Sequence, residues 1–177
     1  MLELMNELDE VWARMLGEAR AKAQGAGNQE VAEYLALKAT NDMIRQASVQ
    51  WLFDSTIEIA ADANRNGAVT MIETIHPHRF VFGNSSLVGS RLNLRQGVRC
   101  LSLEAGWTRT PADGFMRGGA LAIAQITHFG LSKQNAELVL ITENNLPSWF
   151  AVDKDGKREI FDSRNLNEHF LVFLGTI

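Results

Sequence analysis

The first part of the chain alternates hydrophobic and polar residues with the period of an α-helix. Its hydrophobic positions recur at steps of three or four residues, with acids and arginines between them: Leu4, Leu8, Val11 or Trp12, and Met15. This spacing predicts an amphipathic helix over residues 2–22. Gly25 and Gly27 follow and are typical of a helix end, so we expect a turn before the next element.

Residues 28–64 contain neither glycine nor proline, and their hydrophobic positions again follow a helical period. This stretch therefore predicts helix. Ser55 and Glu58 have the spacing of a capping box, so a second helix start inside the stretch fits as well as one uninterrupted helix. The sequence NRNG at 64–67 supplies the asparagine and glycine that commonly end a helix.

After Gly67 the pattern changes to short runs rich in β-branched and aromatic residues, separated by turn residues. Runs of this kind lie at 68–75, 78–83, 91–94, 98–107, 120–129, 137–142, 148–153, 158–161 and 169–175. Such spacing without intervening helices predicts an antiparallel sheet of about seven strands, curved or closed into a barrel-like form. The expected fold class is α+β, with possible dimerisation helices at 1–66 and an antiparallel β domain at 67–177.

The composition is that of a globular protein, with 46% hydrophobic and 21% charged residues. No hydrophobic run approaches the roughly 18 residues needed to span a bilayer. The N-terminal stretch carries acids among its apolar residues, whereas a secretory signal begins with basic residues. A single cysteine, Cys100, excludes an internal disulfide and a site built from several thiolates. Together these features predict a cytoplasmic protein of bacterial type.

Charge is distributed unevenly along the chain. Residues 1–64 carry eleven acids and five bases, a net charge of −6, whereas residues 79–117 carry six arginines and two acids, a net charge of +4. Such an asymmetry concerns partners and self-association more than fold. The whole chain has a net charge of −4 and lacks the broad basic surface of a nucleic-acid binder, so nucleic acid is not an expected partner.

The positive stretch uses arginine only, and arginine presents a planar fork that matches carboxylates and phosphates bidentately. The candidate ligand-binding residues are five arginines and one tryptophan that would stack on a ligand if exposed: Arg91, Arg95, Arg99, Arg109, Arg117 and Trp107. On a strand, Arg91 and Arg95 share a face, and Arg99 would join them across a hairpin. The glycines of DGFMRGG, beside Arg117, would form an anion-binding nest, a bulge or a long turn. The alternative is that the arginines cover sheet edges and pair with acidic helices.

The segment NSSLVG, with Asn84, Ser86 and Gly89, resembles the second nucleotide-binding motif of PilZ domains in its spacing. Those domains are β-barrels that bind cyclic di-GMP through arginines, so the resemblance implies a small anionic ligand. The paired-arginine motif that the family carries upstream is absent here, because Arg65 and Arg79 do not have its spacing. The chain is therefore not assigned to that family.

Histidines offer a second kind of chemistry. His76 and His78 lie beside Glu73, but Pro77 between them disturbs strand geometry and no metal-binding motif accompanies them, so no metal site is expected. A small hydrolase or lyase would use His76, His78 or His128 as a base next to a nucleophile. The sequence contains no nucleophile elbow, P-loop or dinucleotide fingerprint to support such an enzyme.

We therefore expect a non-enzymatic regulatory or adaptor module that self-associates through its N-terminal helices. Its arginine-bearing sheet face would bind an anionic small ligand or an acidic protein partner. One alternative is the small hydrolase or lyase with a histidine base. Another is a purely structural assembly protein, in which the acidic helices of one subunit meet the basic sheet of the next. The sequence identifies neither the ligand nor a cofactor.

Overall fold

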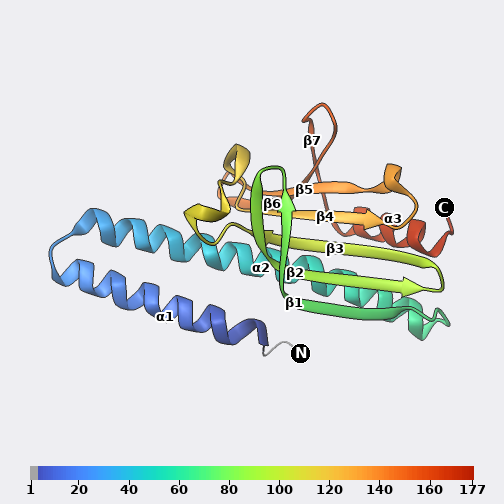
Figure 1. The fold of residues 1–177 in the computed structure, drawn as a ribbon, viewed down its shortest axis with the longest axis horizontal. Coiled ribbons are helices and arrows are strands. Elements are labelled where there is room, and N and C mark those ends of the chain that lie inside the picture. Colours follow the sequence, from blue (N-terminus) through green and yellow to red (C-terminus); the bar gives the residue numbers. More distant parts are fainter. Residues whose placement is uncertain (1–3) are drawn as a thin grey trace. The chain divides into compact units, whose positions relative to one another are not determined.

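The computed structural model describes residues 4–177, with side chains described from Glu10 onward. The chain divides into two compact units, Met1–Gln46 and Ala47–Ile177, and the boundary falls inside a long helix. Along the chain, two helices are followed by a seven-strand antiparallel sheet and a C-terminal helix (Figure 1). The expected α+β class is therefore confirmed.

The two N-terminal helices are α1, Leu4–Gly25, and α2, Gln29–Arg65. Gly27, with a φ of 74°, makes the turn between them in a left-handed conformation that favours glycine. α2 is one uninterrupted helix of 37 residues, so Ser55 lies inside it and does not begin a second helix. Gly67, with a φ of 98°, follows its end, as the sequence NRNG predicts.

Within the first unit, an indole and a carboxylate join α1 to α2. Trp12 Nε1 donates a hydrogen bond to Asp42 Oδ2 at 3.0 Å, and the Lys38 ammonium lies 5.1 Å from the centre of the Trp12 ring. Arg45 also donates to Asp42, at 2.7 Å, so this buried carboxylate has two donors. The buried hydrophobic residues among the described side chains of this unit are small in number: Leu16, Ala23 and Ala32.

The seven strands are β1 (Met71–Phe82), β2 (Ser85–Gln96), β3 (Arg99–Trp107), β4 (Ala122–His128), β5 (Ala136–Glu143), β6 (Leu146–Val152) and β7 (Arg158–Ile160). Each strand pairs antiparallel with the next, so β1 and β7 are the two edges and the sheet is open rather than closed. The runs expected at 68–75 and 78–83 are joined in β1, whose pairing with β2 shifts between Ile75 and His78, around Pro77. An edge strand tolerates this proline because one side of its backbone is unpaired.

One face of the sheet carries the main core. Its buried side chains come from alternate positions of the central strands: Leu92, Leu94, Leu101, Leu103, Ala105, Ala124, Ile126, Leu138 and Leu140. The part of α2 in the second unit adds Leu52 and Phe53, and the C-terminal helix α3 (Ser163–Leu174) adds Phe170. Helices on one face of an antiparallel sheet leave the other face open for function.

Helix α3 corrects the expectation of a strand at 169–175. Its N-cap is Asp162, whose carboxylate accepts from N–H groups of the first turn, while the Asn165 side chain accepts from the Asp162 N–H at 2.9 Å. The helix ends at Gly175, which has a left-handed φ of 73°. Its buried residues lie at helical spacing: Leu166, Phe170 and Phe173. Because helix, unlike strand, puts these three on one side, burying them favours helix.

At one end, the sheet folds over the face opposite the main core. Gly89 of β2 pairs with Gly106 of β3, and a Cβ at Gly89 would lie 1.9 Å from the Ala105 carbonyl oxygen. The missing side chains allow this close approach, and the joined ends of β1 and β2 turn away from the direction of β3 (Figure 1). A small second core fills the fold: Phe80, Leu87 and Ile123, with Phe82, Met116 and Val139 packed against them.

Candidate functional site on the open face of the sheet

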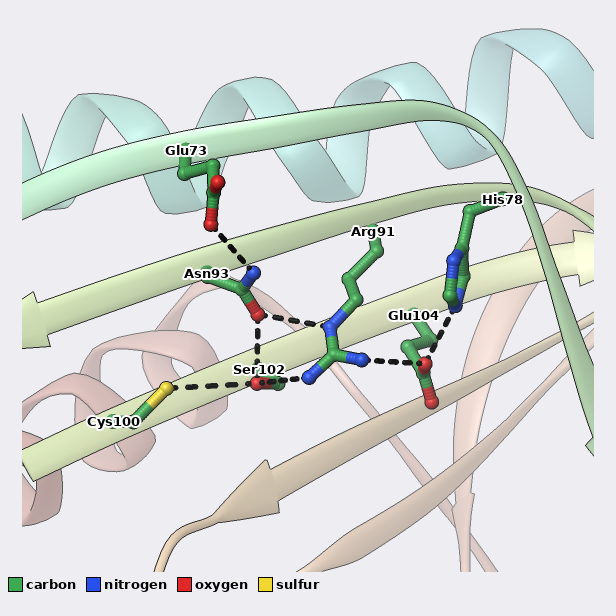
Figure 2. Close-up of polar contacts among 7 residues, drawn as sticks. All are labelled: Glu73, His78, Arg91, Asn93, Cys100, Ser102 and Glu104. Carbon is green, nitrogen blue, oxygen red and sulfur yellow. Dashed lines mark hydrogen bonds and ion pairs between the residues drawn. The ribbon is translucent and has the colours of Figure 1, made fainter.

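Seven residues of β1, β2 and β3 form a connected set of polar contacts on the face opposite the main core (Figure 2). We call them the polar cluster: Glu73, His78, Arg91, Asn93, Cys100, Ser102 and Glu104. Strand alternation explains the set, because side chains at every second position point to the same face. The intervening residues, such as Leu92 and Leu103, point into the main core.

Arg91 lies at the centre of the polar cluster. Its Nε donates to Asn93 Oδ1 at 2.9 Å, and its Nη2 donates to Ser102 Oγ at 3.2 Å. Its Nη1 lies 3.5 Å from Glu104 Oε1. Each guanidinium nitrogen thus has a partner within the chain, and a ligand at Arg91 would have to displace one of them.

The Asn93 amide and the Ser102 hydroxyl, both buried, also have hydrogen-bond partners within the polar cluster. Ser102 Oγ donates to Asn93 Oδ1 at 2.9 Å, and Asn93 Nδ2 donates to Glu73 Oε2 at 3.0 Å. Cys100 Sγ lies 3.7 Å from Ser102 Oγ. Asn93 is 2% exposed and Ser102 is 8% exposed, so these hydrogen bonds replace the water that burial removes.

His78 and Glu104 form an acid–base pair in the polar cluster. His78 Nε2 lies 2.7 Å from Glu104 Oε1, and both side chains are mostly buried. The His78 ring also stacks on Phe80, with ring centroids 5.9 Å apart. A carboxylate that orients a histidine is typical of general-base sites. However, no hydroxyl or thiol of the described side chains contacts His78.

The other candidate bases lie in different surroundings. His76 Nδ1 is 2.8 Å from Ser90 Oγ and 3.1 Å from the Gly89 carbonyl oxygen. Ser90 is 1% exposed, so its hydroxyl is not open to a substrate. His128 lies on the core side of β4, away from the face that carries the polar cluster. The three histidines therefore do not converge on one pocket.

His128 of β4 and His169 of α3 form a buried pair instead. His128 Nε2 lies 2.9 Å from His169 Nδ1, with ring centroids 5.2 Å apart. Burial lowers the pKa of His128, and burial followed by the neighbouring His128 lowers the pKa of His169 to about 4. Both rings are therefore neutral near pH 7, and their hydrogen bond joins α3 to the sheet.

The predicted ligand-binding residues of β2 and β3 do not gather around Arg91. Arg95 lies on the same face as Arg91, as predicted, and it is exposed. Arg99 does not join them: it donates to the Leu174 carbonyl oxygen at the end of α3. A cation there complements the negative end of the helix dipole, which gives Arg99 a structural role.

The remaining predicted residues lie in or before the loop between β3 and β4. Arg109 Cζ lies 4.0 Å from the centre of the Trp107 ring, a cation–π contact. Trp107 is 4% exposed, so it has no open ring face for a ligand. Arg117 is exposed, in the same loop as three glycines of positive φ. The predicted arginines thus occupy several places rather than one pocket.

Sequence reasoning missed the acceptors that organise the polar cluster. Two features of the sequence could have identified them. Arg91 and Asn93 are two positions apart on a strand and so share a face, and Glu104 is the single acid among the arginines of 89–110. The contact of His78 with Glu104 had no sequence signal, because these residues lie on strands that are not neighbours in the sheet. The fold at Gly89 brings them together.

A separate groove of about 370 Å³ lies in the second unit between α2 and β6. Aromatic residues line it: Trp51, Trp149 and Phe161. Trp149 Nε1 donates to the Ser48 carbonyl oxygen at 3.1 Å, which fixes this indole against α2. None of the predicted ligand-binding residues lines the groove.

Within the described part of the chain, no group of three histidine, cysteine or carboxylate side chains is placed to hold a metal ion. No helix among the described residues is long and apolar enough to cross a membrane. Comparisons with protein-family models, with curated proteins and with solved structures gave no match. The function must therefore be inferred from the residues themselves.

Proposed function

We propose that the chain is a non-enzymatic regulatory or adaptor module that self-associates through α1 and α2. Its β domain binds an anionic ligand or an acidic partner through arginines. The observation that carries this proposal is the hydrophobic surface of the first unit, where large side chains are exposed on both helices: Val11, Trp12, Met15, Val31, Tyr34, Leu37 and Met43.

A pair of helices cannot by itself enclose a core, because each helix contacts the other along one narrow stripe. Tyr34, Leu37 and Met43 are 63%, 60% and 62% exposed, and Met15 is 54% exposed. Large hydrophobic side chains left exposed to this extent mark an interaction surface. A second copy fits it, because a twofold axis sets the side of the helix pair that carries Tyr34 and Leu37 against itself and completes a bundle of four helices.

The anion-binding part of the proposal depends on which arginines are not already neutralised. Arg91 shares Glu104 with His78, and Arg79 is paired with Asp113 at 2.9 Å. By contrast, no carboxylate among the described side chains lies within ion-pair distance of Arg95 or Arg117. These two exposed guanidinium groups are therefore the predicted donors that remain available for a negatively charged partner.

Light scattering on the full chain tests the self-association. We expect the wild type to form a dimer or larger oligomer and the double variant Tyr34→Glu/Leu37→Glu to be monomeric, because two charges at these positions cannot be buried in the interface. Tyr34→Phe/Leu37→Met, which keeps both positions hydrophobic, is the control and should keep the oligomer. Circular dichroism checks that both variants remain helical. A wild type that stays monomeric throughout would overturn the proposal.

A further inference from the structure

The loop between β3 and β4 ends in a backbone concavity. Gly118 and Gly119 belong to the short helix η2 (Arg117–Gly119) and have φ values of 63° and 73°. A left-handed residue after a helical one turns successive N–H groups toward one side, and such nests bind anions. Both glycines are exposed, and no hydrogen bond to either N–H occurs among the described residues.

Arg158 of β7 lies directly against this loop. A Cβ at Gly118 would lie 2.9 Å from Arg158 Nη2, so glycine is what allows the guanidinium to approach. Its neighbours Lys157 and Glu159 pair with each other at 3.0 Å, and strand alternation turns Arg158 to the other face of β7. The strand register puts Arg158 on the same sheet face as Arg91.

The side chain of Arg117 extends toward the hairpin of β1 and β2. Its Cζ lies 4.0 Å from the position of a Cβ at Gly83, in the turn of that hairpin. Ser85 Oγ donates to the Phe115 carbonyl oxygen at 3.0 Å, which ties the loop to the hairpin two residues before Arg117. The loop is therefore supported by a neighbouring element rather than by its own sequence alone.

The charges around the loop leave two cations without a counterion. Asp113 is the one acid of this loop, and it already forms an ion pair with Arg79 at 2.9 Å. This contact, together with hydrogen bonds from backbone N–H groups, holds the pKa of Asp113 below its usual value. Arg117 and Arg158 have no carboxylate partner among the side chains that the structure describes. The Arg158 guanidinium lies beside the free N–H donors and Arg117 belongs to the same loop, so two unpaired cations here favour a compact dianion.

We propose that Arg117, Arg158 and the backbone N–H groups of Gly118 and Gly119 form a binding site for the phosphoryl group of a small molecule. The two guanidinium groups supply paired donors, and the N–H groups supply fixed ones at the back of the site. This inference rests on the proposed anion-binding function, and it names both the place and the class of ligand. Arg158 was not among the arginines expected from the sequence to bind a ligand.

The test is an NMR titration of the ¹⁵N-labelled full chain at constant ionic strength, with inorganic phosphate in one arm and phenyl phosphate in the other. We expect the amide signals of Gly118 and Gly119 to shift in at least one arm, and tighter binding of phenyl phosphate would favour a phosphorylated organic molecule over free phosphate. Arg117→Ala and Arg158→Ala should each weaken binding by about tenfold or more, the cost of one charge-assisted contact. Arg20→Ala removes an exposed arginine of α1, outside the β domain, and should leave binding unchanged.

Other outcomes separate this site from the broader proposal. Binding that survives in both Arg117→Ala and Arg158→Ala but is lost in Arg95→Ala would overturn the site while retaining an anion-binding sheet face. Absence of any shift at Gly118 and Gly119 in either arm would also overturn it. Self-association is measured independently by light scattering, so its failure and the failure of this site are distinguishable.

Discussion

At the scale of single residues, Gly89 decides where the sheet folds. A Cβ at this position would lie 1.9 Å from the Ala105 carbonyl oxygen and 2.6 Å from the Gly106 Cα. Both obstacles are backbone atoms, which cannot rotate aside as the end of a long side chain can. The fold at Gly89 in turn brings His78 to Glu104 and closes the small second core. One missing side chain thus positions contacts on three strands.

We predict that Gly89→Ala destabilises the β domain by about 3 kcal/mol, in the range seen when buried backbone must move. Urea denaturation of the full chain measures this change. Gly17→Ala is the matched control, because a Cβ at Gly17 in α1 meets nothing within 4 Å. Replacing a helical glycine by alanine should be neutral or stabilising by up to about 1 kcal/mol. Equal stability of Gly89→Ala and wild type would contradict the assigned role.

At the scale of elements, the His128–His169 pair makes the docking of α3 sensitive to pH. The ordinary pKa of histidine is 6.5, and that of His169 in the folded chain is about 4, so the folded state binds this proton less readily than the unfolded state. The stabilisation is therefore complete above about pH 6.5 and is lost as the pH falls toward 4.

We predict that the free energy of unfolding falls by on the order of 3 kcal/mol between pH 7 and pH 4 because of this residue. Urea denaturation of wild type and His169→Phe at several pH values checks it. Phenylalanine keeps a ring against Phe161 but has no proton to gain, so the variant should lose less stability over the same range. If the two proteins showed the same pH dependence, the pair would not be the cause.

The elements also show what sequence patterns can and cannot predict. The period of hydrophobic residues was enough for α1, α2 and the central strands, because each has a clear apolar face. The run HFLVFLG was misread as strand because all but two of its residues are apolar, so it has no visible period by itself. The helical spacing becomes visible only when Leu166 is included, and Asp162 and Gly175 mark the two helix ends.

The candidate site was less predictable than the fold for a physical reason. Alternation correctly places Arg91 and Arg95 on one face, since it depends only on neighbouring positions. Which acceptors Arg91 meets depends on strand register, and which loop Arg158 meets depends on the fold of the sheet. Neither is encoded locally, so Arg99 was expected beside Arg91 although it reaches α3 instead.

At the scale of the whole molecule, the two units differ in how well each buries its own hydrophobic residues. The second unit has a core on one sheet face and a smaller one on the other, whereas the described part of the first unit leaves most of its large hydrophobic side chains exposed. An incomplete unit of this kind is stabilised when a partner covers it. Self-association through α1 and α2 is thus the central claim about this protein.

Sedimentation equilibrium of the full chain at low and high salt tests that claim most directly. Because the surface of the first unit is hydrophobic, we predict an oligomer that persists in about 1 M NaCl, where charge–charge contacts between subunits are screened within roughly 3 Å. An oligomer that dissociates in salt would instead favour assembly through acidic helices and basic strands. A single chain at every protein concentration and at both salt levels would contradict the claim outright.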